Sequence, residues 1–134
     1  MENIIVTGSC GFIGHNFIKS NSSNFKIIGI DSLNNAYDKK LKELRLSSLN
    51  DEQNFTFKHL DLSNENALDK ESEIFENVST VLHLGARAGV RQSFLDPKSY
   101  ILDNTAATAN LALIVKKHKI KKFIIASTSS IYGD

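Results

Sequence analysis

The chain has 134 residues, of which 41% are hydrophobic and 23% charged, and its formal net charge is +1. These values suit one globular domain with a single core, and the balanced charge excludes the strongly basic footprint of a nucleic-acid-binding protein. A single cysteine excludes an internal disulfide, and the four histidines show no metal-ligand spacing. We therefore expect neither a disulfide framework nor a metal site.

The N-terminal segment does not have the pattern of an export signal, because no basic residues precede an apolar run. No apolar stretch is long enough to cross a bilayer. Lysines cluster between residues 116 and 122, where we interpret them as cations at a helix end followed by a solvated turn. We expect a cytoplasmic protein with neither membrane nor nucleic acid among its partners.

In chain order, five short apolar runs rich in Ile, Val and Phe predict strands that are covered on both faces, and helical spacing predicts a helix after each of the first four. The strands cover residues 3–7, 26–31, 55–60, 80–84 and 123–127, and the helices cover 12–20, 38–49, 64–75 and 97–118. This alternation predicts parallel pairing through right-handed crossovers. The expected fold is α/β, a doubly wound parallel sheet of about five strands with flanking helices, in one domain over residues 1–134.

Two of these helices carry further signals. The pattern over 38–49 predicts an amphipathic surface helix with leucines and lysines on opposite sides. The leucines are Leu41, Leu44 and Leu49, and the lysines are Lys39, Lys40 and Lys42. The helix over 97–118 is expected to begin with Asp96 as its N-cap and Pro97 at its first position, and its alanines let it pack closely on a sheet.

Three glycines stand in the stretch "VTGSCGFIG", residues 6–14, between the first predicted strand and the first predicted helix. Glycine there permits a tight turn, lets the backbone approach a pyrophosphate and allows close packing of helix on strand. The helix N-terminus then offers unpaired N–H groups to the phosphates. The position favours a Rossmann-type dinucleotide site, with an unusual loop that binds nothing as the alternative.

Asp31 supports the dinucleotide interpretation, because it ends the second strand about twenty residues after the glycine loop. A carboxylate at this point accepts hydrogen bonds from the adenosine ribose hydroxyls and repels a 2′-phosphate. The combination predicts NAD rather than NADP as the cofactor.

The G-x-x-G-x-x-G spacing, preceded by Thr7, resembles the extended short-chain dehydrogenase/reductase family of nucleotide-sugar epimerases and dehydratases. The resemblance continues through "IGIDSLNNAYD" (28–38), "HLDL" (59–62), "VLHLGARAGVRQSFLDP" (81–97), Asn104 and "IIASTSSIYGD" (124–134). Several segments in the right order make it more specific than any single motif. Within the family, the chain is most similar to the UDP-glucuronate 4-epimerases.

The resemblance implies a set of cofactor-binding residues. Glycines and neighbouring backbone would hold the pyrophosphate, Asp31 and Asn34 the adenosine ribose, and Asp61 with Leu62 the adenine. A turn residue at a strand end is the alternative for Asp61. Gly85 stands where the family usually has alanine, and Cys10 is interpreted as a small loop filler rather than a reactive thiol. The complete set is Gly8, Gly11, Phe12, Ile13, Gly14, Asp31, Asn34, Asp61, Leu62, Leu84, Gly85, Ala86 and Asn104.

Three further residues are candidates for the sugar. Arg91, in the loop expected after the fourth strand, can fork onto the carboxylate of a uronic acid; a surface or structural arginine is the alternative. By resemblance, Thr128 and Ser129 would hydrogen-bond the sugar hydroxyl that is oxidised. Related dehydratases have Thr-Asp-Glu at positions 128–130, and Ser129 and Ser130 cannot supply that acid and base. Epimerisation is therefore favoured over dehydration.

The implied reaction is transient oxidation of a UDP-sugar at C4 and return of the hydride to the opposite face, with a Tyr-x-x-x-Lys pair on the next helix as the base. No Tyr-x-x-x-Lys is present, and Tyr132 belongs to the "YG" motif. The chain is therefore interpreted as the N-terminal portion of an epimerase, truncated before that helix and without the C-terminal substrate domain. A homodimer of the full-length protein stays open.

Two alternatives to an epimerase remain at this point. One is a standalone, non-catalytic NAD(H)-binding module, and the other is the N-terminal part of a related nucleotide-sugar dehydratase. The coding sequence that follows Asp134 distinguishes the module from an enzyme.

Overall fold

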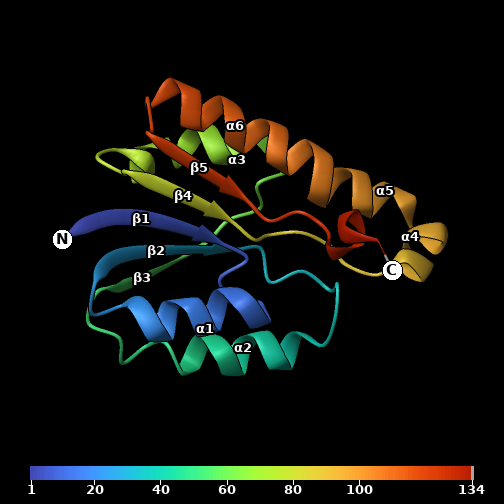
Figure 1. Cartoon of the computed structure of the whole chain (residues 1–134), viewed down its shortest axis with the longest axis horizontal. Coiled ribbons are helices and arrows are strands. Elements are labelled where there is room, and N and C mark those ends of the chain that lie inside the picture. Colours follow the sequence, from blue (N-terminus) through green and yellow to red (C-terminus); the bar gives the residue numbers. More distant parts are fainter. Residues whose placement is uncertain (134) are drawn as a thin grey trace.

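The computed structural model describes residues 1–133 and contains one parallel sheet with the strand order β3-β2-β1-β4-β5. The predicted parallel α/β fold is confirmed. β1 lies at the centre, so the chain first winds outward through β2 and β3 and then crosses to the other side through β4 and β5 (Figure 1). The strands are β1 (Glu2–Thr7), β2 (Phe25–Asp31), β3 (Phe55–His59), β4 (Thr80–His83) and β5 (Lys122–Ile125).

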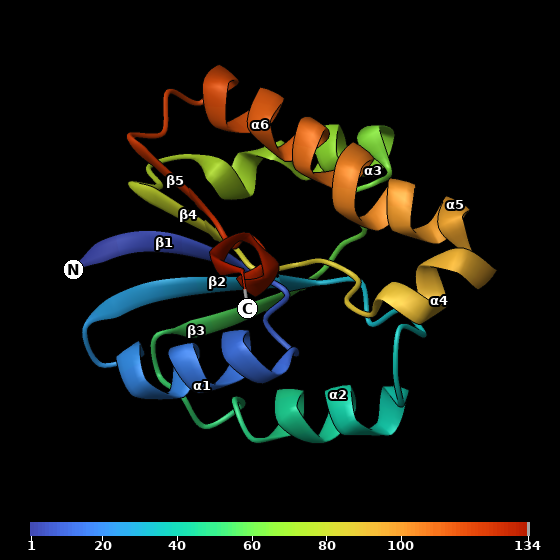
Figure 2. The ribbon, with the colours of Figure 1, turned by 45° about the vertical axis from the view of Figure 1, so that its right-hand side comes forward.

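Helices cover both faces of the sheet, with α1 and α2 on one side and α3 and α6 on the other (Figure 1). Two short 3₁₀ turns, η1 (Ser72–Phe75) and η3 (Ser129–Tyr132), follow α3 and β5. The α-helices are α1 (Phe12–Asn21), α2 (Lys39–Ser47), α3 (Glu65–Lys70), α4 (Val90–Leu95), α5 (Pro97–Tyr100) and α6 (Ala107–Lys117). Turning the molecule brings α4 and the carboxyl ends of the strands forward (Figure 2).

Alternate side chains of β1 pack into two separate hydrophobic cores. Ile5 packs with Val81 and Leu111 in the larger core, under α3 and α6, whereas Ile4 and Val6 pack with the smaller core under α1. Side chains of a strand point alternately to opposite faces, so a central strand in a two-sided sheet must be apolar throughout. This requirement explains the continuous apolar run that predicted the strand.

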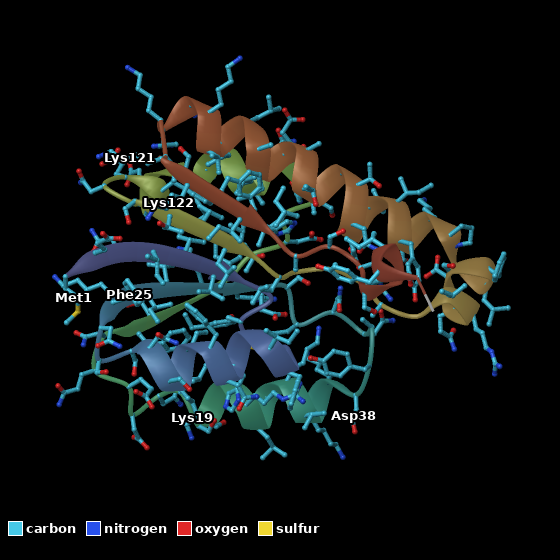
Figure 3. All side chains as sticks on the ribbon, in the orientation of Figure 1. Met1, Lys19, Phe25, Asp38, Lys121 and Lys122 are labelled. Atoms are coloured by element: carbon cyan, nitrogen blue, oxygen red, sulfur yellow. The ribbon has the colours of Figure 1, made fainter. Side chains whose placement is uncertain are left out.

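The helix predicted to begin after Asp96 has its expected N-cap. The Asp96 carboxylate accepts a hydrogen bond from the Ser99 backbone N–H, and Pro97 follows at the first helical position, as predicted. Hydrogen bonding from the side chain and the backbone N–H of Ser99 lowers the pKa of Asp96. Asp38 caps α2 at the carboxyl-end side of the sheet, whereas Lys121 and Lys122 lie at the opposite end (Figure 3).

The long helix predicted over 97–118 is present, but it is interrupted by a π-helical segment. Between α5 and α6, residues Ile101–Ala106 form a π-helical segment, η2. A π-turn holds one residue more than an α-turn and shifts the direction of the side chains on it. Asp103 and Asn104 stand on this segment.

Three predictions about local structure are wrong. Residues 90–95 form α4 instead of a loop, and they gave no helical signal because none of them is buried. β5 ends at Ile125 instead of the predicted residue 127, and the region of the "YG" motif forms η3. In α2, Leu41 and Leu44 are exposed while Lys42 is buried, so the predicted apolar side is not the one that faces the protein.

The larger core predicts a strong difference between two leucines of α6. Leu111 is fully buried, whereas Leu113 is 61% exposed. Leu111→Ala should lower the free energy of unfolding by about 2–5 kcal/mol, because it leaves a cavity that the rigid sheet cannot close. Leu113→Ala, the matched control, should change it by no more than about 0.5 kcal/mol. Denaturant unfolding measures both, and equal effects would contradict this packing.

Candidate functional site

A cavity of about 310 Å³ lies at the carboxyl ends of β1, β2, β3 and β4. This edge, where the strand order reverses next to β1, is where open α/β sheets bind ligands. Nine of the predicted cofactor-binding residues meet in its lining: Gly8, Gly11, Asp31, Asn34, Asp61, Leu62, Leu84, Gly85 and Ala86. The cavity volume lies at the lower end of the range for small-molecule sites.

The glycine loop is shaped by contacts that leave no room for side chains. Gly8 has a φ of +67°, and a Cβ on it would lie 2.9 Å from the backbone of Leu84 and Gly85. A Cβ on Gly14 would lie 2.3 Å from the Gly8 carbonyl oxygen. The loop is therefore a bare backbone cradle between the loop after β4 and the first turn of α1.

The first turn of α1 follows directly after this cradle and begins with uncapped backbone N–H groups. Gly11 is the N-cap residue, no side chain of the described part of the chain caps the helix, and no acidic residue stands in its first turn. The N–H groups of Phe12, Ile13 and Gly14 have no partner within the helix, as at every helix start. Such an N-terminus can bind an anionic group beside the glycine cradle.

A buried hydrogen-bond chain joins the loops after β1 and β4. The Thr7 Oγ1 accepts hydrogen bonds from the backbone N–H groups of Leu84 (3.2 Å) and Gly85 (3.0 Å). It also lies 2.6 Å from His83 Nδ1, while His83 Nε2 lies 2.8 Å from Thr108 Oγ1. Because Thr108 donates its proton to the Asn104 carbonyl, it must accept from His83 Nε2–H. His83 is then the neutral Nε2–H tautomer, and Thr7 donates to its Nδ1.

Asp31 presents its carboxylate to the cavity from the end of β2. Its Oδ2 accepts the backbone N–H of Cys10 at 3.0 Å, and its Oδ1 accepts that of Leu33 at 2.9 Å. Leu33 adopts a left-handed backbone conformation, with φ of +51°, which a leucine rarely takes. The turn after β2 therefore accepts local strain that keeps Leu33 N–H on the carboxylate.

Polar side chains continue this arrangement across the rim of the cavity. Lys42 Nζ donates to Asn34 Oδ1 at 2.9 Å, and Asn34 Nδ2 donates to Asp103 Oδ2 at 2.9 Å. Arg87 Nε donates to the same oxygen of Asp103, and its Nη2 donates to Asn35 Oδ1 at 3.1 Å. The network links the segment before α2, the loop after β4 and the π-helical segment η2.

The remaining predicted residues do not line the cavity. Phe12 and Ile13 are exposed at the start of α1, and Gly14 is buried beneath the Gly8 carbonyl. Asn104 makes a two-way contact with Arg87, accepting its backbone N–H at 2.6 Å and donating to its carbonyl oxygen at 3.0 Å. Asn104 therefore holds the loop after β4 rather than facing the cavity.

The three residues predicted for the sugar lie apart from the cavity. Arg91 is exposed on α4, and Thr128 and Ser129 are exposed at the start of η3. Thr128 caps η3 by accepting the Ser130 backbone N–H at 3.2 Å. Both segments lie on the side of the carboxyl ends of the strands (Figures 1 and 2).

Cys10 is buried in the glycine loop. Burial, with a further contribution from the Asp31 carboxylate, raises the pKa of its thiol to about 11. The thiol is therefore protonated at neutral pH, in agreement with a loop filler.

Sequence reasoning missed Lys42 and Arg87 as site residues. Lys42 belongs to the inward face of α2, and the buried Leu49, seven residues further on and just after the helix, lies on the same side. That spacing of seven was present in the sequence, but a lysine in it gave no apolar signal. Arg87 stands four positions before Arg91 within the same quoted motif, and nothing in the sequence separated an arginine held by Asp103 from an exposed one.

Neither a metal site nor a membrane-spanning helix is found among the described residues. Among residues 1–133, no group of three or more His, Cys, Asp or Glu side chains could hold a metal ion. Within the same part of the chain, no helix has the length and apolar character that crossing a membrane requires.

The fold and cavity define a dinucleotide-binding type of α/β protein, and the family is shown by comparison with known proteins. Residues 4–134 match the family model described as the NAD dependent epimerase/dehydratase family. The chain belongs to the NAD-dependent epimerase/dehydratase family.

Its relatives include enzymes that act on nucleotide sugars. The chain is 42% identical over 135 residues to a UDP-glucuronate 4-epimerase of Thermodesulfobacterium geofontis, covering 96% of this chain and 40% of the relative. It is 34% identical to a UDP-glucose 4-epimerase of Dictyostelium discoideum, covering 99% of this chain and 38% of that protein. The chain thus spans about two fifths of the length of these curated relatives.

Among solved structures, the UDP-glucuronic acid 4-epimerase of Bacillus cereus in complex with UDP-glucuronic acid and NAD is similar to this chain. The TM-score is 0.87 at 33% identity, and the match covers 98% of this chain and 42% of the other. The matching part is the N-terminal portion of the epimerases.

The buried chain around His83 predicts a pH dependence of stability. Burial lowers the pKa of His83 below its usual 6.5, so the folded protein binds this proton less readily than the unfolded chain does. The stabilisation from neutral His83 is complete above pH 6.5 and is lost as the pH falls from 6.5 through the lowered pKa. One proton changes the unfolding free energy by at most about 1.4 kcal/mol per pH unit.

Denaturant unfolding at a series of pH values tests this dependence. Between about pH 7 and pH 5, the unfolding free energy of the wild-type chain should fall more steeply than that of His83→Gln, whose amide stays neutral. His15→Gln serves as comparison. Burial also lowers the pKa of His15, but this side chain is only partly buried, so its effect on the unfolding free energy should be smaller. Parallel curves for the wild type and His83→Gln would contradict the neutral assignment.

Proposed function

We propose that this chain binds NAD and forms the NAD-binding part of a nucleotide-sugar epimerase that acts on UDP-glucuronate. The observation that carries the proposal is the meeting of nine residues, expected from sequence as cofactor contacts, in one cavity at the switch point of the sheet. Membership of the NAD-dependent family supports the choice of cofactor.

Each part of the cavity suits one part of the dinucleotide. The glycine cradle and the N-terminus of α1 would hold the pyrophosphate, and Asp31 would accept the adenosine ribose hydroxyls. Asp61 is held by the backbone N–H and hydroxyl of Ser63, so its side chain is fixed at the adenine end beside Leu62. Leu84, Gly85 and Ala86 would border the rest of the cofactor, with Asn104 and Thr7 holding that loop in place.

NAD would supply a hydride acceptor and donor for the sugar C4. The chain's own residues would orient the substrate: Thr128 and Ser129 offer hydroxyl groups to the sugar, and Arg91 offers a guanidinium to its carboxylate. Hydroxyl groups at positions 129 and 130 cannot act as the acid and base of water loss at neutral pH. This chemistry favours epimerisation over dehydration.

UDP-glucuronate is preferred among the nucleotide sugars because of Arg91 and the relatives. The exposed guanidinium on α4 suits a uronic acid, and relatives at 42% and 36% identity are named as UDP-glucuronate 4-epimerases. The family's base would be a Tyr-x-x-x-Lys pair, which these 134 residues lack.

Calorimetric titration of the purified chain with NAD tests the cofactor site. The wild type should show saturable binding, and Gly14→Ala should weaken it about tenfold or more, because its Cβ would collide with the Gly8 carbonyl and displace the helix N-terminus from the pyrophosphate. Lys19→Ala, an exposed change in the same helix, should leave affinity unchanged. A wild-type chain that melts cooperatively and binds no NAD would contradict the proposal.

The epimerase assignment is tested on the gene product that contains this chain. An in-frame Tyr-x-x-x-Lys downstream of Asp134 is expected, and the protein that contains it should convert UDP-glucuronate to its C4 epimer, resolved by chromatography. Arg91→Ala should raise KM for UDP-glucuronate about tenfold while changing that for UDP-glucose little. A stop codon directly after Asp134 would instead favour the non-catalytic NAD-binding module.

A further inference from the structure

Lys42 is a buried cation at the ribose end of the cavity. Only 5% of the residue is exposed, and its ammonium group lies 3.7 Å from Asp31 Oδ1. The Nζ also lies 4.8 Å from the centre of the Tyr37 ring, and the residue lines the cavity. A buried lysine needs compensation, and Asp31 supplies the opposite charge.

The hydrogen bonds of Lys42 leave donors unused. An ammonium group has three N–H donors, and in the described part of the chain one of them bonds Asn34 Oδ1 at 2.9 Å. The 3.7 Å separation from Asp31 is an ion pair, but it is too long for a hydrogen bond. Lys42 therefore has donor capacity left beside the space that Asp31 faces.

Asp31 has acceptor capacity left as well. Each of its two oxygens accepts one backbone N–H, from Cys10 and from Leu33, and each carboxylate oxygen can accept two hydrogen bonds. Two acceptor positions are enough for the pair of hydroxyl groups on a ribose. The carboxylate is also fixed in place, since both backbone donors belong to the turns that flank the cavity.

Two cations and one carboxylate meet at this end of the cavity. Arg45 lies beside Lys42, where its Nη1 donates to the Cys10 carbonyl at 3.3 Å and to the Tyr37 hydroxyl at 3.1 Å. Among the described residues, Asp31 is the carboxylate paired with Lys42, and the Asp103 carboxylate is already paired with Arg87. Removal of the Asp31 charge would leave a buried ammonium and a nearby guanidinium without a counter-ion.

We propose that Lys42 is the second determinant of cofactor choice: Asp31 neutralises it and takes the ribose hydroxyls, and a chain without that carboxylate presents Lys42 to the 2′-phosphate of NADP. A 2′-phosphate would replace the carboxylate as the counter-ion, and phosphate oxygens accept charge-assisted hydrogen bonds from the free ammonium donors. The inference rests on the proposed binding of NAD. It assigns to Lys42 a role that a purely structural ion pair would not have.

Titration of four chains with NAD and with NADP tests the inference: the wild type, Asp31→Ser, Lys42→Met and the double variant Asp31→Ser/Lys42→Met. The wild type should favour NAD. Asp31→Ser should shift the ratio of NADP to NAD affinity by about tenfold or more toward NADP, including an absolute gain in NADP affinity. The double variant should lose that gain, because methionine keeps the length of the side chain without its charge.

The outcomes separate the inference from the proposed function. A folded wild type that binds neither dinucleotide overturns both. A wild type that binds NAD overturns the role of Lys42 alone if Asp31→Ser gains no NADP affinity, or if the double variant gains as much as Asp31→Ser does. If thermal melting shows that Asp31→Ser does not fold, Asp31→Asn retains an acceptor for Cys10 and must show the same shift toward NADP.

Discussion

The close approach of two backbones at the carboxyl end of the sheet is the constraint on which the cavity depends. Gly8 and Gly85 lie so near each other that a side chain on either would meet the other's loop, and Thr7 fastens them with one hydroxyl group. The same hydroxyl is oriented by His83, whose ring is held in turn by Thr108 on α6. Three elements that are distant in sequence thus set the spacing of a single loop pair.

Electrostatics organise the other side of the cavity. Carboxylates, cations and an amide follow one another in a chain of ion pairs and hydrogen bonds along one rim. Its members are Asp31, Lys42, Asn34, Asp103 and Arg87. Buried ionic groups are stable only when paired, so these side chains hold the segment before α2 in a defined position against η2. With this network in place, the Asp31 carboxylate lines the cavity and keeps hydrogen-bond acceptor positions that no described residue uses.

The sequence was sufficient for the sheet because buried parallel strands are apolar on both sides and because glycines between strand and helix mark a backbone approach. The number of residues between the glycines and Asp31 also indicated that Asp31 lies near the glycine loop, and both line the cavity. Sequence reasoning failed where tertiary contacts override periodicity: Lys42 faces inward because Asp31 and Asn34 lie there, and α4 forms without burying a residue. The roles of Arg91, Thr128 and Ser129 stay predictions, since their side chains are exposed and do not line the cavity.

The π-helical segment η2 lets two parts of the long helix respond differently to the deletion of a residue. Its extra residue sets Asp103 toward Arg87 and Asn34 while α6 still turns Leu111 and Ile114 into the core. Deletion of one residue within η2 would return this turn to the α-helical count, so α6 would keep its direction toward the core, but Asp103 and Asn104 would lose the positions from which they hold Arg87. The irregular turn therefore serves the rim of the cavity, whereas the regular helix that follows it serves the core.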